Sequence, residues 1–209
     1  MRGSSRGLAW TLVALAVLTG RESVAAPAER VSLELQLGAR AGLDDNDIRL
    51  VEETAVTLLA TGGIDAEWQT CQPVTACPVE RRVVVLVQVL PLWKMADRDV
   101  CGEVVRDFRT DLPIVLVYLS RNREVTLQMR SGSIGRWHPA LATLEVGHVV
   151  GLTIAHEVGH ALGLPHSANG VMKAKPTVDD VIALRQSRLA FSPPERARML
   201  AALATDLGF

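Results

Sequence analysis

The chain has 209 residues, of which 48% are hydrophobic and 22% are charged, and its formal net charge is −1 at pH 7. This length is enough for one domain with a substantial core and leaves little room for a second. The nearly balanced charge offers nothing to nucleic acid or to an anionic membrane surface, so we expect neither as a partner.

Residues 1–28 have the pattern of a secretory signal peptide. Two arginines are followed by an apolar run over 8–18 and then by small residues. The run is shorter than the ~20 residues that span a bilayer, which favours removal of the segment over its retention as an anchor. Cleavage after Ala25 or after Ala28 would suit a small-residue rule. We therefore expect a secreted or periplasmic protein whose single domain covers 29–209.

The first part of the mature chain predicts two strands around one helix. Residues 31–37 alternate loosely between apolar and polar, as a strand does. Residues 44–61 carry apolar side chains at helical spacing, with acidic residues in the first turn and two glycines after the last. Residues 64–68 alternate again and predict the second strand.

The next segments predict further strands. The runs 83–90 and 114–119 are almost entirely apolar, which is typical of strands buried on both faces. Residues 125–129 alternate, and we expect them to pair antiparallel with the preceding run across a turn at 120–124.

Three cysteines, Cys71, Cys77 and Cys101, make an odd number in an exported chain. We expect one disulfide and one thiol. A Cys71–Cys77 bridge is favoured over the two pairings with Cys101, because it encloses a short loop. The preference is slight, since disulfide connectivity cannot be read from sequence.

A long helix is expected to begin after Thr143, a suitable N-cap, with Glu145 in its first turn. Gly147, Gly151 and Gly159 weaken that helix by up to ~1 kcal/mol each relative to alanine. Glycines at these positions indicate that the helix packs closely on the sheet.

The most informative stretch is 156–166, which reads HEVGHALGLPH. In a helix, residues four apart project from one face, so His156 and His160 can share a metal. Glu157 lies about 100° round the helix from His156, too far to act as a ligand but within reach of a water molecule on the metal. That position suits a general base.

The residues after this helical turn can bring a third imidazole to the metal. Gly163 can adopt the left-handed conformation that ends a helix, and Leu164 before Pro165 favours extended backbone. His166 can then return as a ligand. Three histidines with an open fourth position predict a catalytic rather than a structural zinc site. We expect His138 and His148 to lie outside it.

The stretch has the form H-E-x-x-H-x-x-G-x-x-H and resembles the zinc signature of the metzincin metalloproteases, and Ser167 resembles the matrixin branch. The resemblance implies an α+β fold with a twisted mixed sheet, a backing helix, an active-site helix and a small helical C-terminal subdomain. The division would fall at about 29–163 and 164–209. It also implies zinc on His156, His160 and His166, and Glu157 as general base.

Met172 fits the methionine turn that metzincins have beneath the zinc, and Gly170 favours a turn there. Two features depart from the matrixin pattern. The interval between His166 and Met172 is short, and Ala174 replaces a tyrosine that some relatives carry two residues after the methionine. The archaemetzincin branch is disfavoured, because no downstream cysteine cluster could hold its second metal.

Helix-start signals at 177–180 and 192–195 predict two helices after the methionine turn. In the fold that the resemblance implies, an antiparallel edge strand lines the cleft and binds peptide. Either 114–119 or 125–129 could be that strand.

We therefore predict an exported, monomeric zinc endopeptidase that acts on proteins or peptides. Zinc is expected to polarise the scissile carbonyl and acidify a water molecule, while Glu157 takes the proton and passes it to the leaving amine. One alternative is a zinc-containing binding or structural protein on the same scaffold that no longer cleaves peptide. Another is a narrow hydrolase that cuts one processing site or a cell-wall peptide.

Overall fold

The computed structural model describes most of the chain beyond the predicted signal peptide. The described residues are 31–40, 42–69, 83–91, 100–109, 112–135 and 137–206. Residues 1–28 and the cysteines Cys71 and Cys77 lie outside them. Removal of the signal and the Cys71–Cys77 bridge therefore stay predictions.

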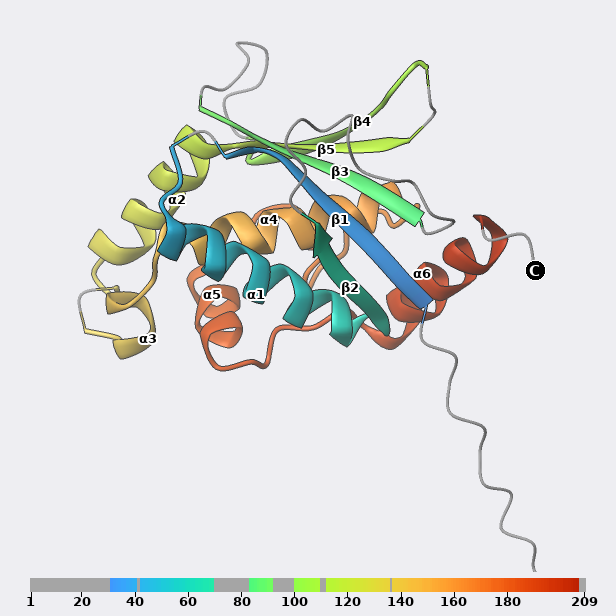
Figure 1. Cartoon of the computed structure of the whole chain (residues 1–209). Coiled ribbons are helices and arrows are strands. Elements are labelled where there is room, and N and C mark those ends of the chain that lie inside the picture. Colours follow the sequence, from blue (N-terminus) through green and yellow to red (C-terminus); the bar gives the residue numbers. More distant parts are fainter. Residues whose placement is uncertain are drawn as a thin grey trace, which may run out of the picture.

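A five-stranded mixed sheet forms one layer of the molecule (Figure 1). Its strands are β1 (Val31–Arg40), β2 (Ile64–Gln69), β3 (Val83–Leu90), β4 (Gly102–Arg106) and β5 (Pro113–Tyr118). The spatial order is β2-β1-β3-β5-β4, in which the first four strands are parallel and β4 is antiparallel to β5. The sheet thus has an antiparallel edge at β4, and the predicted strands 31–37, 64–68, 83–90 and 114–119 are confirmed.

Six helices lie in the described residues. They are α1 (Asp45–Thr61), α2 (Leu119–Ser131), α3 (Pro139–Ala142), α4 (Val146–Ala161), α5 (Val178–Arg185) and α6 (Pro193–Asp206). In Figure 1, α1 and α4 run side by side along one face of the sheet. None of the helices in the described ranges has the length and apolarity required to cross a membrane.

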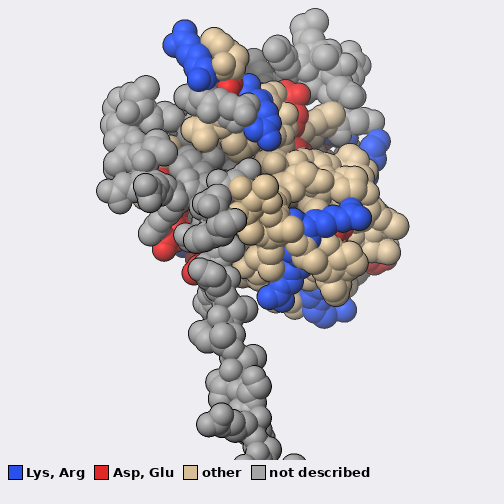
Figure 2. All heavy atoms as spheres, turned by 90° about the vertical axis from the view of Figure 1, so that its right-hand side faces the viewer, with Lys and Arg blue, Asp and Glu red and all other residues tan. Residues whose placement is uncertain are grey.

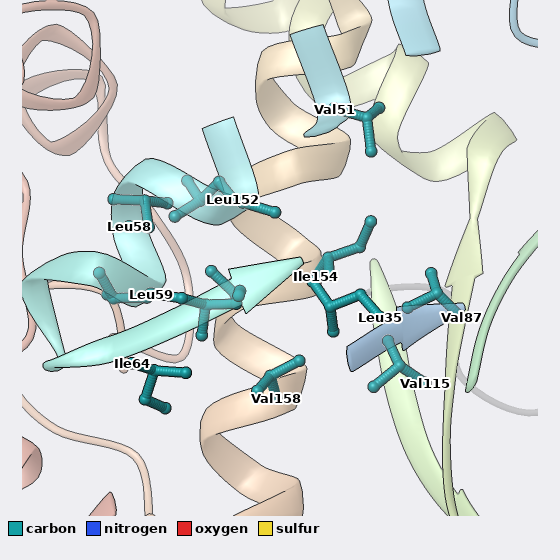
Figure 3. Close-up of a cluster of buried hydrophobic side chains, with 14 of the residues drawn as sticks. Leu35, Val51, Leu58, Leu59, Ile64, Val87, Val115, Leu152, Ile154 and Val158 are labelled. Carbon is teal, nitrogen blue, oxygen red and sulfur yellow. The ribbon is translucent and has the colours of Figure 1, made fainter. Parts of the chain in front are cut away.

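The main core lies between the sheet and these two helices, as Figure 3 shows. Strand residues Leu35, Val87 and Val115 meet Ile154 and Val158 of α4, and all five side chains are fully buried. Burial of such a side chain contributes roughly 1.5–3 kcal/mol. This packing fixes α4, the helix that carries the histidine motif, against the sheet.

The predicted helix at 44–61 is confirmed as α1. Its N-cap Asp44 accepts a hydrogen bond of 2.8 Å from the backbone N–H of Asp47. Ile48, Val51 and Leu58 are buried, as their spacing predicted. This helix is the layer against which α4 packs.

The prediction of a strand at 125–129 is wrong, because these residues belong to α2. Val125 and Met129 are four residues apart, so a helix places both on the face that packs on a small apolar cluster, while Leu127 is 64% exposed. The antiparallel partner of β5 is β4, which precedes it in the sequence. Neither candidate edge strand, 114–119 or 125–129, lies at the sheet edge.

The start of the motif helix also differs from the prediction. Thr143 is the C-cap of α3, and the N-cap of α4 is Glu145. The backbone N–H of Glu145 donates to Nδ1 of His148 over 3.1 Å. His148, and not the predicted N-cap Thr143, therefore supplies a side-chain acceptor at the start of this helix.

The helix glycines are packed closely, but not on the sheet as predicted. A β-carbon on Gly147 would lie 2.5 Å from the carbonyl oxygen of Asp47, and one on Gly151 would lie 2.6 Å from Cβ of Thr54. Both neighbours belong to α1. These glycines therefore allow the two helices to approach closely.

The two predicted C-terminal helices are confirmed as α5 and α6. Asp180 accepts from the N–H of Thr177 over 2.7 Å, and Glu195 accepts from the N–H of Ser192 over 2.6 Å. Both helix-start signals, at 177–180 and 192–195, thus cap the helices that follow them, as the sequence indicates. Figure 2 shows Lys and Arg side chains scattered over this face, with other residues between them.

Candidate metal centre

Three histidines converge at the C-terminal end of α4. His156 and His160 project from the same face of the helix, and their Nε2 atoms are 3.0 Å apart. The ring of His166 lies with its centroid 5.2 Å from that of His156 and 4.7 Å from that of His160. One ligand atom from each ring lies within 4.8 Å of the other two. The described part of the chain therefore holds a His triad that could bind a metal ion.

Backbone carbonyls fix the tautomers of two of these rings. Nδ1 of His156 lies 2.8 Å from the carbonyl oxygen of Val171, and Nδ1 of His160 lies 2.7 Å from that of Leu164. A carbonyl only accepts, so each Nδ1 carries the proton and each Nε2 presents a lone pair. Two lone pairs that face each other at 3.0 Å repel each other unless a proton or a metal ion lies between them. This donor set fits zinc, for which imidazole is a preferred ligand.

Burial favours the neutral, ligating form of the two helical imidazoles. It lowers the pKa of His156 to about 4 and shifts the pKa of His160 in the same direction. Only the neutral ring has a lone pair to give to a metal.

The chain returns to the triad through a tight turn after α4. Gly163 has a φ of +81°, the left-handed conformation predicted for it. The N–H of Leu164 donates to the carbonyl of Gly159 over 2.9 Å, and this closes the end of the helix. The turn thereby aims the Leu164 carbonyl at His160 and leads the exposed His166 back towards the other rings.

Met172 lies in a turn below the triad. It is fully buried, and its carbonyl accepts a hydrogen bond of 2.9 Å from the N–H of Ser167. The residue before it, Val171, supplies the carbonyl that orients His156. The turn thus connects the segment after His166 to the first ligand of the motif.

Glu157 lies next to the triad on the buried side of α4 and is 7% exposed. Burial, followed by the charge of Glu103, raises the pKa of the Glu157 carboxyl from its ordinary 4.5 to about 7. A carboxyl with that pKa exchanges protons readily near neutral pH, which is the property a general base needs.

These groups open onto a cleft of about 780 Å³. One stripe of α4 forms its floor, from Val149 and Leu152 at the apolar end to His156, Glu157 and His160 at the other. Strand β4, α2 and the segment that follows Met172 form its walls. The cleft is large enough for a peptide segment.

The strand β4 approaches α4 most closely at Gly102. A β-carbon there would lie 2.9 Å from Cγ of Glu157 and 2.8 Å from Cγ2 of Thr153. Asn122 ties the same region together, because its Nδ2 donates to the Cys101 carbonyl over 3.0 Å and its Oδ1 accepts from Thr153 over 2.8 Å. No pattern in the sequence indicates these contacts, which join residues far apart in the chain.

The remaining two histidines have local roles outside the triad, as expected. Nδ1 of His138 accepts from the N–H of Ala140 over 3.3 Å at the start of α3. His148 is buried and contacts Arg185.

Comparisons with known proteins give fold-level likeness only. No protein-family model matches the chain, and no curated protein matches it in sequence. Its fold is similar to archaemetzincin from Methanopyrus kandleri, with a TM-score of 0.47, 15% identity, and coverage of 87% of this chain and 99% of that chain. It is also similar to metalloproteinase-II from Bacteroides fragilis, with a TM-score of 0.44, 13% identity, and coverage of 85% and 55% respectively. The chain thus spans about half the length of the second protein.

The predicted fold class is confirmed. The described residues form an α+β fold with a mixed sheet, a backing helix α1, a helix α4 that carries the histidine motif, and two C-terminal helices.

Proposed function

We propose that the protein is a zinc-dependent endopeptidase of metzincin type. The observation that carries this proposal is the pair of Nε2 atoms of His156 and His160, whose lone pairs are directed to one point by the carbonyls bound at Nδ1. His166 supplies the third donor, and Glu157 lies beside them in the same cleft.

Zinc held at this site would supply Lewis-acid polarisation of a carbonyl group and lower the pKa of a water molecule. Glu157 accepts the proton of the attacking water and then delivers it to the leaving amine. Without the metal, a pKa of about 7 leaves the protonated and ionised forms of Glu157 close in free energy at neutral pH, and the charge of a bound zinc would favour the ionised form that accepts the proton. The cleft walls orient the peptide and exclude water from the reacting bond.

The finer assignments belong to the same proposal. Residues 1–28 direct export and are then removed, which places the mature enzyme outside the cytoplasm. Ser167 directly after the third histidine supports a matrixin-like branch. Peptides or proteins are the substrates, and the enzyme acts as a monomer.

The metal assignment is tested on purified mature protein by elemental analysis. We expect one zinc per chain, and its loss when His156, His160 or His166 is replaced by alanine, because three ligands leave no spare donor. Stoichiometric zinc in a folded His166→Ala variant would exclude His166 as the third ligand.

Catalysis is tested by Glu157→Gln, which preserves the shape of the side chain and removes the base. Zinc should remain bound, and cleavage of a peptide library should fall by about 10² to 10⁴, equivalent to about 3–5 kcal/mol of activation free energy. Glu53→Gln is the matched control, since Glu53 is an exposed carboxylate on α1. Equal cleavage by wild type and Glu157→Gln would exclude Glu157 as the base. A zinc-loaded wild type that cleaves no peptide would instead support the non-catalytic zinc protein.

A further inference from the structure

The edge strand β4 contacts Glu157 at Gly102, and the next residue of the strand, Glu103, brings a carboxylate to the cleft. Gly102 packs against Cγ of Glu157, and Glu103 follows it. Both residues line the cleft together with the histidine triad, and Glu103 is exposed. A peptide that lies along β4 with its scissile bond at the triad therefore passes Glu103.

The Glu103 carboxylate is held in place by a buried tyrosine. The hydroxyl of Tyr118 donates to Oε1 of Glu103, and Tyr118 is only 3% exposed. A carboxylate can accept about four hydrogen bonds, so this single donor leaves capacity for a ligand. The hydrogen bond from Tyr118 limits the rotamers of Glu103. Glu103 therefore loses less side-chain conformational entropy when it binds a ligand.

The cleft is lined by three acidic side chains, Glu103, Glu157 and Asp180, and by three basic ones, Arg121, Lys173 and Lys175. Lys173 forms an ion pair with Asp180 at 2.8 Å, and Arg121 forms one with Glu124 at 2.7 Å. Among the described residues, no lysine or arginine forms an ion pair with Glu103.

We propose that Glu103 is a specificity-determining residue that binds an ammonium group of the substrate beside the scissile bond. This inference rests on the proposed peptidase function. An ammonium group matches a fixed carboxylate in charge and in hydrogen-bond donors, and such charge-assisted bonds are roughly twice as strong as neutral ones. Two groups of a peptide supply this chemistry. A lysine side chain fits the endopeptidase proposed above, whereas a free N-terminal amine beside the scissile bond would make the enzyme an aminopeptidase.

The test uses a sequence that the wild-type enzyme cleaves in the library digest. The two peptides of the first pair differ only in their N-terminus, which is free in one and acetylated in the other and directly precedes the residues that flank the scissile bond. A second pair has lysine or norleucine at those flanking positions. For each pair we compare the ratio of kcat/KM values, charged over neutral, in wild type, Glu103→Gln and the control Glu53→Gln. Zinc content and circular dichroism verify that each variant is folded and loaded.

We expect the ratio to exceed one in wild type and in Glu53→Gln, and to fall about tenfold in Glu103→Gln, mainly through KM. The pair that shows the fall identifies the source of the ammonium, the N-terminus or a lysine. An unchanged ratio in both pairs would refute the role of Glu103 while the peptidase function stands. Absence of all cleavage by zinc-loaded wild type would refute the peptidase function, and the role of Glu103 with it.

Discussion

The sulfur of Met172 occupies the space that a side chain on Gly159 would need. A β-carbon built on Gly159 would lie 2.4 Å from Sδ of Met172 and 3.1 Å from its Cε. Gly159 lies between the ligands of the motif helix, and Met172 lies in the turn whose preceding carbonyl orients His156. The missing side chain therefore lets the turn pack directly under the metal-binding helix.

Gly159→Ala should consequently destabilise the protein, although alanine is the better helix former. The substitution gains up to ~1 kcal/mol of helix propensity, but overpacking of a rigid site costs about 1–3 kcal/mol. Since the displaced turn carries the Val171 carbonyl, zinc affinity should fall as well. Urea unfolding with zinc present and a competitive chelator titration measure the two effects.

The double variant Gly159→Ala/Met172→Ala serves as the control for this contact. Met172→Ala alone leaves a cavity in a fully buried site, at a cost of about 2–5 kcal/mol. If the clash is real, the new methyl partly fills that space, and the double variant is more stable than the sum of the single effects predicts. Strict additivity would contradict the contact.

The local part of the site could be predicted because it depends on residues a few positions apart. The spacing of His156, Glu157 and His160 needs only the geometry of a helix, and Gly163 ends that helix for reasons local to itself. The apolar periodicity of α1 and the buried runs of β3 and β5 are equally local signals.

The remainder could not be predicted because it depends on contacts between distant segments. The run 125–129 fits both a two-residue and a four-residue period, and the buried Asn122 bonds that tie α2 to Cys101 and Thr153 are not visible in the sequence. Strand β4 is short, and its place at the sheet edge follows from pairing with β5. Nothing in the sequence therefore indicates that Glu103 lies in the cleft.

Gly102→Ala should reduce catalysis without removing the metal. Its β-carbon would lie within 3.0 Å of Thr153, Glu157 and the Leu116 carbonyl, so either β4 or the Glu157 side chain must move. Misplacement by a fraction of an ångström to 1 Å costs about tenfold to hundredfold in rate. We expect that loss in kcat/KM with full zinc content. Val105→Ala, at an exposed position of the same strand, is the control and should keep wild-type activity.

Tyr118→Phe tests the hydroxyl that holds Glu103. The phenylalanine ring fills the same buried space, so the free energy of unfolding should fall by only about 1 kcal/mol. With its carboxylate no longer fixed, Glu103 should bind ammonium less well, and KM for the charged peptides should rise severalfold while kcat changes little. The double variant Tyr118→Phe/Glu103→Gln should match Glu103→Gln alone. A further loss in the double variant would show that Tyr118 acts on the substrate independently of Glu103.

His148 should make the stability of the protein sensitive to acid at the start of the motif helix. Burial, followed by the nearby Arg185, lowers the pKa of His148 below its ordinary value of 6.5. As the pH falls below about 6.5, the unfolded chain takes up this proton before the folded protein does, so the free energy of unfolding decreases. Above that pH the group is neutral in both states and does not change the free energy of unfolding.

His148→Gln keeps a side-chain acceptor that can reach the N–H of Glu145, as glutamine does in a capping box, and removes the titration. We therefore expect the decrease between pH 6.5 and pH 5, measured by urea unfolding, to be smaller in His148→Gln than in wild type. Since the two proteins share the other histidines, the difference between their pH profiles isolates His148. Identical profiles would show that His148 is protonated as easily in the folded protein as in the unfolded chain, contrary to its burial beside Arg185.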